Sequence, residues 1–222
     1  MNNIKTFENF NNEYIFEYIE NNDIESVKNY INSGYDLNIS DDGGDTALIE
    51  ATFYNNIEIV ELLLNAGADI DKQSNKGNTA LIHAAYYNNV EIVKLLLNAD
   101  VDINKQNNDG YNALIWVACK NNKEIVKLLL NADADIDKQN NNGDTALIYA
   151  AYRNNLEIVE ILLDYGADEF ILDNNDKSFY DYLNIENKEY FLHKYPTSVY
   201  NAISHNYKKS FTEFVKDYNI KN

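Results

Sequence analysis

The sequence predicts an all-α fold in which short helix pairs stack as a repeat solenoid, and three observations support this prediction. Glycine recurs at an interval of 33 residues, at Gly44, Gly77, Gly110 and Gly143. Each of these glycines is soon followed by Thr-Ala-Leu-Ile or a close variant. Each copy later reads Glu-Ile-Val-x-Leu/Ile-Leu-Leu. Self-similarity at one fixed period over so many positions is the signature of a repeat architecture.

The first helix of each repeat has a recognisable start and end. Thr46, or its equivalent, can accept a hydrogen bond from an orphan amide at the helix start. Leu48, Ala51 and Thr52 then form a narrow face of small residues, which allows a neighbouring helix to approach closely. Asn55-Asn56 ends the helix, because asparagine tolerates the left-handed conformation of a tight turn. The same pair recurs at 21–22, 88–89, 121–122 and 154–155.

A second helix follows, apolar at residues 59, 60, 63 and 64. Gly67 stops it as a left-handed cap, and the polar segment after it reads as a hairpin-like connector. Asp100 and Asp133 stand where other repeats have this glycine. We expect both aspartates in the left-handed conformation at a cost of about 1 kcal/mol relative to glycine. Neutral drift explains them better than a role in binding, although that role stays open.

These elements resemble the ankyrin repeat family. The matching motifs are Thr-x-Leu-x-x-Ala, Glu-Ile-Val-x-x-Leu-Leu and Gly-Ala-Asp-Ile, across roughly residues 21–183. The resemblance implies helix-turn-helix units with hairpin-like connectors, and a role in protein-protein interaction. Two departures stand out: alanine replaces the family's usual proline at Ala47 and its equivalents, and isoleucine replaces the usual histidine at Ile49 and its equivalents. Since that histidine braces adjacent connectors in the family, we expect looser connectors here.

The repeat register divides the chain into units. Residues 1–40 are an N-terminal capping repeat, whose first helix, predicted over 13–20, carries glutamates on its outer face. Four full ankyrin repeats follow at 41–73, 74–106, 107–139 and 140–172. Residues 173–195 are a degraded C-terminal capping repeat, with a short second helix expected near 188–195. Pro196 breaks the chain, and the C-terminal tail, 196–222, is expected to be partly helical.

The composition excludes several classes of function. The formal charge of −18 and the pI near 4.4 argue against nucleic acid or an anionic membrane as partner. One cysteine excludes an intramolecular disulfide. Neither a leader peptide nor a membrane span is evident. We therefore expect a cytoplasmic monomer, although secretion without a leader stays open, and the Asn38 sequon has no expected role.

The sequence offers no catalytic, cofactor or metal site. His83, His193 and His205 lie far apart, and His83 reads as one variant of a packing position. Cys119 has no histidine placed by the sequence to activate it, so it reads as a small residue on a helix face. The segment 102–106 lacks the glycine and the closing glutamate of a calcium loop. We expect neither an enzyme nor a cofactor.

Exposed aromatic and charged side chains are therefore the candidate binding residues. The resemblance places the ends of the first helices on the concave side, beside the connector tips. The candidates at the helix ends are Phe53, Tyr54, Tyr86, Tyr87, Lys120, Tyr152 and Arg153, and those at the tips are Asp42, Asp45, Lys76, Asp109, Tyr111 and Asp144. Tyrosine supplies rigid contact area with a polar handle. Biased composition is the competing explanation, since the chain has 18 tyrosines.

The predicted function is a protein-protein interaction module for a neutral or basic partner protein, bound in the concave groove. One alternative is an inhibitor or immunity-like protein that masks a basic enzyme. A more remote alternative is a catalytic role of the tail after Pro196.

Overall fold

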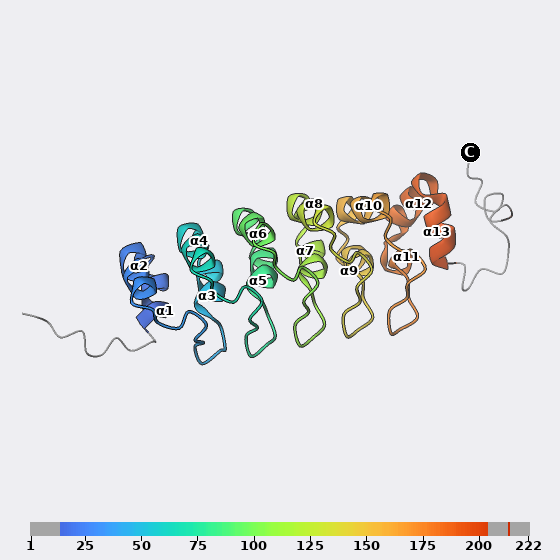
Figure 1. Ribbon diagram of the computed structural model, residues 1–222. Coiled ribbons are helices and arrows are strands. Elements are labelled where there is room, and N and C mark those ends of the chain that lie inside the picture. The colour runs from blue at the N-terminus through green and yellow to red at the C-terminus, as the bar shows by residue number, and fades with distance from the viewer. Residues whose placement is uncertain (1–13, 204–212, 214–222) are drawn as a thin grey trace, which may run out of the picture. The chain divides into compact units, whose positions relative to one another are not determined.

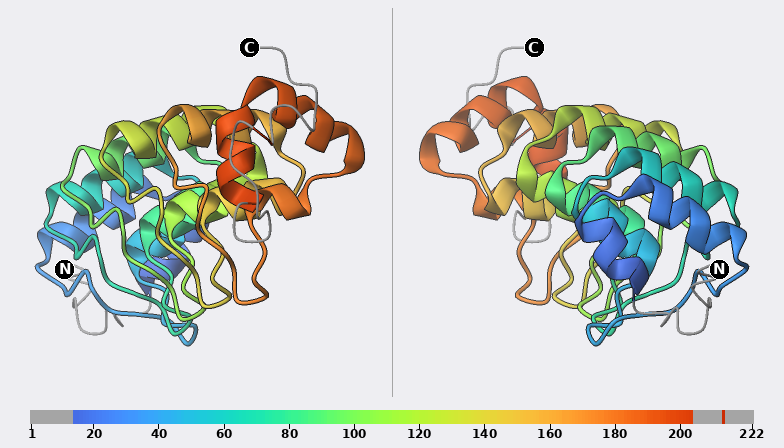
Figure 2. Two further views of the ribbon diagram at one scale, coloured as in Figure 1. Left: turned by 90° about the vertical axis from the view of Figure 1, so that its right-hand side faces the viewer. Right: turned by 90° about the vertical axis from the view of Figure 1, so that its left-hand side faces the viewer.

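The structure is a computed structural model that describes residues 14–203 and residue 213. Within these residues the protein is helical, with one isolated β-bridge between Ser40 and Thr46 and no strand. The chain divides into two compact units, residues 1–101 (unit 1) and residues 102–222 (unit 2). Figures 1 and 2 show helices in antiparallel pairs within each unit, with the connectors of a unit extending to one side.

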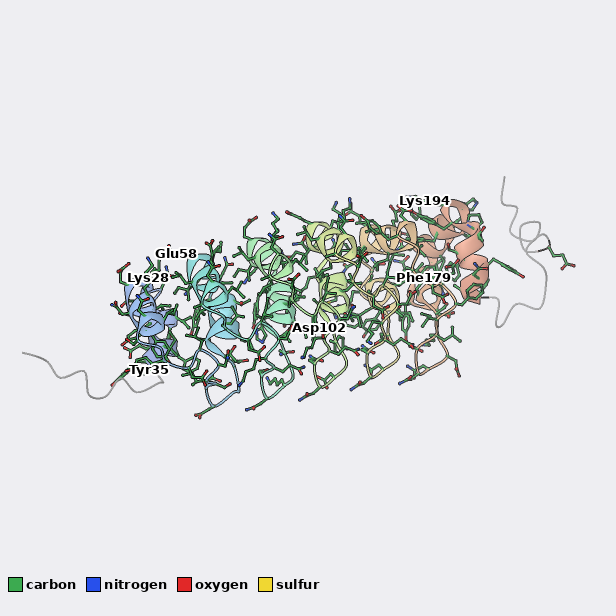
Figure 3. The ribbon with its side chains drawn as sticks, in the orientation of Figure 1. Lys28, Tyr35, Glu58, Asp102, Phe179 and Lys194 are labelled. Carbon is green, nitrogen blue, oxygen red and sulfur yellow. The ribbon has the colours of Figure 1, made fainter. Side chains whose placement is uncertain are left out.

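The described part of unit 1, residues 14–101, contains three helix pairs. The helices are α1 (Tyr14–Glu20), α2 (Ile24–Asn32), α3 (Ala47–Phe53), α4 (Ile57–Asn65), α5 (Ala80–Tyr87) and α6 (Val90–Leu97). The first helices α1, α3 and α5 pack in succession, and so do the second helices α2, α4 and α6. Leu48, Ile59 and Leu63 are fully buried between these layers. Lys28 of α2 and Glu58 of α4 pair across neighbouring second helices at 3.5 Å (Figure 3).

The described part of unit 2, residues 102–203 and residue 213, contains three further helix pairs and one more helix after them. The helices are α7 (Ala113–Lys120), α8 (Lys123–Asn131), α9 (Ala146–Tyr152), α10 (Leu156–Asp164), α11 (Phe179–Tyr182), α12 (Ile185–Lys194) and α13 (Pro196–Ile203). Helix α9 packs against α7 and α11, and α13 packs against α11 and α12. Phe179 of α11 (Figure 3) is buried. Val199 and Ala202 of α13 are buried as well.

The second helix of the last repeat differs from the prediction. A short helix near 188–195 was expected, but α12 begins at Ile185 and has ten residues. The prediction was wrong because it overlooked the cap: the Asn184 side chain accepts a hydrogen bond from the Asn187 amide at 2.8 Å. The short helix of this pair is α11, whose start carries a capping box between Ser178 and Asp181. Pro196 begins α13 at the first helical position, where its missing N–H costs nothing. The helix expected in the second half of the tail lies outside the described residues, apart from Glu213.

The predicted caps are confirmed. Thr46, Thr79 and Thr145 each accept a hydrogen bond from the amide three residues on, at 3.2–3.3 Å, and Asn112 does the same at 2.9 Å. The first asparagine of the pairs at 55–56, 88–89, 121–122 and 154–155 has a positive φ, between 57° and 69°. In the pair at 21–22 the left-handed residue is the second asparagine, Asn22, with a φ of 52°. Asp100 and Asp133 also lie in the left-handed region, with φ of 55° and 60°. The local rules of helix initiation and termination therefore hold in both units.

Side-chain amides brace the connectors of adjacent repeats. Asn75 donates to the Asp42 carbonyl at 3.0 Å, and Asn141 donates to the Asn108 carbonyl at 2.9 Å. Gln139 donates to the Leu172 carbonyl at 3.1 Å. The expectation of looser connectors considered only the missing histidine, and these amides supply cross-connector bonds of their own. A Cβ on Gly44 would lie 2.5 Å from the Asn75 amide nitrogen, so the glycine permits this close approach as well as its φ of 77°.

The second asparagine of a pair, which stands just before the second helix, bonds to the first helix of the preceding repeat in the same unit. Asn56 and Asn89 of unit 1 donate to the carbonyls of Ile19 and Thr52, at 2.6 and 2.7 Å. In unit 2, Asn155 donates to the Ala118 carbonyl at 2.8 Å. The Asn-Asn pair thus turns the chain with one residue and ties the repeat to its predecessor with the other. In the part of the chain that the structure describes, no helix has the length and apolarity needed to cross a bilayer.

Candidate functional site

Unit 1 presents a cluster of exposed aromatic rings, which we call the aromatic cluster: Phe53, Tyr54, Tyr86 and Tyr87. These side chains are between 36% and 43% exposed. Phe53 meets the edges of Tyr54 and Tyr87, both with ring centroids 5.1 Å apart, and Tyr86 meets Tyr87 at 4.9 Å. Edge-to-face contacts hold the rings in place while leaving apolar area exposed. The cluster is therefore a rigid apolar surface, built at the ends of α3 and α5.

Three carboxylates gather beside this cluster. Oxygens of Asp41, Asp45 and Glu50 lie within 4.8 Å of one another, the one group of possible metal ligands found between residues 14 and 203 and at residue 213. Burial raises the pKa of Glu50 to about 7, and the charges of Asp45 and Asp41 add to the effect. Burial also raises the pKa of Asp45. These oxygens are hard donors of the kind that calcium prefers. At these distances the negative charges of the three carboxylates repel one another.

His83 contributes a neutral face to the same region. Its ring lies 5.9 Å from that of Tyr87, and burial lowers the pKa of its imidazole to about 4, with the charge of Lys76 adding to the shift. His83 therefore stays neutral at physiological pH. Its Nδ1 is buried and has no hydrogen-bond partner among the described residues. The ring is thus part of the wall on which the exposed tyrosines pack.

Unit 2 contains a hollow of about 420 Å³ between the connectors and the first helices, which we call the tyrosine hollow. Four tyrosines and two aspartates line it, together with three connector asparagines. These residues are Tyr111, Asn142, Asp144, Tyr149, Tyr152, Asp173, Asn174, Asn175 and Tyr182. They come from three successive repeats, so the hollow exists only because the repeats stack in register.

Ring contacts join the tyrosines of the hollow. Tyr111 and Tyr149 have ring centroids 5.5 Å apart, Tyr149 and Tyr152 lie at 6.3 Å, and Tyr152 meets Tyr182 edge-on at 5.5 Å. Trp116 stacks behind Tyr111 at 4.6 Å. A ring packed against its neighbours has few rotamers left to lose, so a ligand meets a pre-organised aromatic wall.

The two carboxylates of the hollow have different surroundings. Asp173 is 5% exposed and accepts hydrogen bonds from the Tyr182 hydroxyl and from the backbone amides of Asn175 and Lys177. Burial opposes its charge, but these bonds hold the pKa of Asp173 below its usual value. Burial and the bond to Asp173 raise the pKa of Tyr182 to about 12. Burial raises the pKa of Asp144, whose carboxylate accepts a bond from Asn140 at 3.1 Å. The carboxylate of Asp173 is thus held by hydrogen bonds within the protein, while that of Asp144 is more accessible to a ligand.

The structure brings together only part of the predicted site. The four rings of the aromatic cluster meet in unit 1, and Tyr111, Tyr152 and Asp144 meet in the tyrosine hollow of unit 2. Asp45 lies in the carboxylate group. The remaining candidates are exposed at connector tips or helix ends and line neither the cluster nor the hollow: Asp42, Lys76, Asp109, Lys120 and Arg153.

Sequence reasoning missed one repeat position that faces the site. In successive repeats this position is occupied by Glu50, His83, Trp116, Tyr149 and Tyr182. All five side chains are half-buried. The prediction treated this position as packing. The variation of this position could have identified it. The residues two and three positions before it are Leu and Ala in every full repeat, whereas the position itself changes from acid to imidazole to indole to phenol. Asp173 was also missed, since it lies in the degraded repeat.

Cys119 has the properties of a packing residue. It is half-buried, and burial raises the pKa of its thiol. A raised pKa disfavours the thiolate that a nucleophile needs. His193, by contrast, is exposed on α12, and His205 lies outside the described residues.

Comparison with known proteins gives a consistent result. A family model described as ankyrin repeats (3 copies) matches residues 15–107 and 99–173. Among solved structures, 592 chains match, and one of them is the crystal structure of EF0377, an ankyrin repeat protein. That match has a TM-score of 0.74 and 31% sequence identity, and it covers 88% of this chain and 98% of the other. No curated protein matches the chain.

Proposed function

Because the chain belongs to the ankyrin repeat family, whose members are in general protein-protein interaction modules and typically non-enzymatic scaffolds, we propose that it binds a partner protein through the surface formed by its first-helix ends and connectors. The aromatic cluster of unit 1 and the tyrosine hollow of unit 2 are the two contact regions. We also propose that the protein acts as a monomer in the cytoplasm.

One observation carries the proposal: four large aromatic side chains from two adjacent repeats are exposed side by side in unit 1. Contiguous exposed apolar area costs solvation free energy in a free monomer and commonly marks an interaction site. Tyrosine and phenylalanine are also the side chains that dominate interface cores, because they bury much area at a small entropic cost.

Charge supports a neutral or basic partner. The formal charge of −18 repels nucleic acid and anionic membranes, and it accelerates the approach of a cationic protein. Acidic connector residues such as Asp42 and Asp109 are exposed where such a partner would arrive. An inhibitor that masks a basic enzyme is the second candidate, which the same charge favours. Capture that falls steeply as salt rises supports the inhibitor, and capture that depends little on salt supports a contact dominated by the aromatic rings.

The experiment uses the full-length chain as bait, beside its Tyr86→Ala/Tyr87→Ala variant. We expect proteins recovered with the wild type to be lost or strongly reduced with the variant. The matched control is Tyr165→Ala/Phe170→Ala, which removes two rings that are 44% and 56% exposed but lie outside both contact regions. Equal recovery by wild type and Tyr86→Ala/Tyr87→Ala, with unchanged circular dichroism, removes the proposal.

A further inference from the structure

The tyrosine hollow of unit 2 has a chemistry that the proposed function does not specify. Its walls are aromatic, its lining includes two carboxylates, and no lysine or arginine lines it. Aromatic faces carry negative electrostatic potential and attract cations, most strongly where water is partly excluded. An anionic ligand would meet Asp144 and Asp173, and a purely apolar one would meet the connector asparagines. The lining therefore favours a cation with hydrogen-bond donors.

We propose that the tyrosine hollow binds the guanidinium group of an arginine side chain of the partner protein. This inference rests on the proposed function and identifies the chemistry that one of its two contact regions recognises.

The chain itself shows that a cation can sit against this wall. The ammonium of Lys177 lies 5.2 Å from the ring centroid of Tyr182. Lys177 is exposed, so its side chain can swing away when another cation arrives. A second nearby cation is Arg153, which is also exposed. Burial raises the pKa of the Tyr149 phenol, and the charge of Arg153 opposes that shift in part. Solvent screens both charges more than it screens a group inside the hollow.

Asp144 is the acceptor that the arginine reaches. Asp173 already accepts bonds from Tyr182 and from two backbone amides, and it is almost fully buried. Asp144 is half-buried and more accessible than Asp173, and its carboxylate accepts bonds from the side chains of Asn140 and Asn142. A half-buried carboxylate lacks part of its solvation, and a charge-assisted hydrogen bond from a guanidinium restores it.

The shape of the hollow favours arginine over lysine. A guanidinium is planar, stacks on aromatic faces and carries five donors in a fixed fork, whereas an ammonium is compact and strongly hydrated. The hollow offers rings for stacking beside the oxygens of Asp144 and of the connector asparagines. Its 420 Å³ lies in the lower part of the roughly 300–1,000 Å³ range of small-ligand sites. It can therefore hold one extended side chain with part of the adjoining backbone.

The test uses the full-length chain and N-acetyl-arginine methylamide as the probe, with NMR of labelled tyrosine rings as the readout. We expect saturable shifts of Tyr111, Tyr149, Tyr152 and Tyr182, with a Kd of about 1–10 mM for a single side chain. Citrulline, in the same blocked form, has nearly the same shape but no charge, and we expect it to bind about tenfold more weakly. The lysine analogue should also bind more weakly than arginine.

Two variants locate the contact. Asp144→Asn preserves the shape of the side chain and should weaken arginine binding about tenfold while leaving citrulline unchanged. Lys177→Ala removes the competing cation and should strengthen arginine binding by about threefold. The Tyr86→Ala/Tyr87→Ala variant in unit 1 is the control and should bind the probe as the wild type does.

Several results would overturn the inference. They are the absence of a saturable shift, equal binding of citrulline, binding of lysine as tight as that of arginine, or an unchanged affinity in Asp144→Asn. If the probe fails while Tyr86→Ala/Tyr87→Ala still loses its partner, this inference is wrong and the proposed function stands. If partner capture survives every variant, the proposed function itself is wrong.

Discussion

Glu50 of unit 1 and Tyr149 of unit 2 occupy the same position of the repeat, and they make two different surfaces from one backbone. The carboxylates of Glu50, Asp41 and Asp45 repel one another, and the aromatic rings nearby are exposed at the helix ends. Beside Tyr149, the rings turn toward the connectors and line a hollow. The helix starts, left-handed turns and connector braces are nevertheless alike in the two units. The residues that are the same in every repeat therefore set the positions of the side chains. A few positions that vary between repeats determine what each unit can bind.

The largest expected effect tests whether the two units share one framework. Gly44→Ala in unit 1 and Gly110→Ala in unit 2 should each destabilise the protein by about 2–3 kcal/mol. Both glycines have a positive φ, and a Cβ would lie 2.5 Å or 2.6 Å from the amide nitrogen of Asn75 or Asn141. Urea denaturation of the full chain measures the loss.

Gly67→Ala is the matched control for the glycine variants. It has a similar φ of 84° but no atom within 4 Å of the added Cβ. Gly67→Ala should therefore lower the free energy of unfolding only by the cost of placing alanine at a positive φ, about 1 kcal/mol. Equal losses for all three variants would show that the connectors do not approach as closely as described.

The next prediction tests the asparagine side-chain bonds that tie one repeat to the first helix of the preceding repeat. Asn89→Ala and Asn155→Ala should each cost about 1–2 kcal/mol, because each leaves a partly buried carbonyl without one of its donors. The carbonyls are those of Thr52 in unit 1 and Ala118 in unit 2. Asn65→Ala, which alters the exposed last residue of α4, should change the free energy of unfolding little. Unequal losses at Asn89 and Asn155 would break the proposed equivalence of the two frameworks.

The framework was predictable from the sequence because its determinants are local. A threonine cap, an asparagine in the left-handed region and a glycine at a tight turn each follow from the conformational preference of one residue. Asp100 and Asp133 were predicted to be left-handed for the same reason, and they are. The start of α12 was missed because the capping residue there, Asn184, lies outside the repeat pattern.

The candidate site was less predictable because it depends on contacts between repeats. Tyr111 and Tyr152 were identified as exposed aromatics, but their meeting with Tyr149 and Tyr182 depends on the register in which three repeats stack. Asp173 looked like part of a degraded repeat, yet its bond from Tyr182 closes one side of the hollow. A pattern read one repeat at a time gives positions on a helix face and does not give the distances between them.

The third prediction tests the carboxylate group of unit 1, formed by Asp41, Asp45 and Glu50. The folded-state pKa of Glu50 is raised from 4.5 to about 7, so the native state holds the proton more tightly than the unfolded state does. Stability from this group is therefore full below pH 4.5 and is lost as pH rises toward 7. Glu50→Gln should stabilise the protein by about 1 kcal/mol at pH 8, a value reduced for solvent screening because the side chain is only half-buried.

The pH profile separates this effect from a general change in surface charge. Glu50→Gln should give no gain at pH 4 and should flatten the dependence of stability on pH between 4.5 and 7. Glu61→Gln removes an exposed carboxylate of α4, in the same helix pair, and should leave the shape of the profile unchanged. A parallel shift of the whole profile in Glu50→Gln would mean that neither burial nor the charges of Asp45 and Asp41 raise the pKa of this residue.

The smallest effect concerns a feature that the two units share. Asp100→Gly in unit 1 and Asp133→Gly in unit 2 should each raise the free energy of unfolding by about 0.5 kcal/mol, and the melting temperature with it. Both aspartates have a positive φ and a carboxylate near the negative end of a helix, which glycine would relieve. The gain is smaller than the conformational cost alone, because glycine also gives the unfolded chain more freedom. Asp69→Gly, an exposed aspartate at the start of a connector, should not stabilise. If Asp100→Gly stabilises and Asp133→Gly does not, the aspartate of unit 2 has gained an interaction that compensates for its strain, and the difference between the units extends beyond the site into the framework.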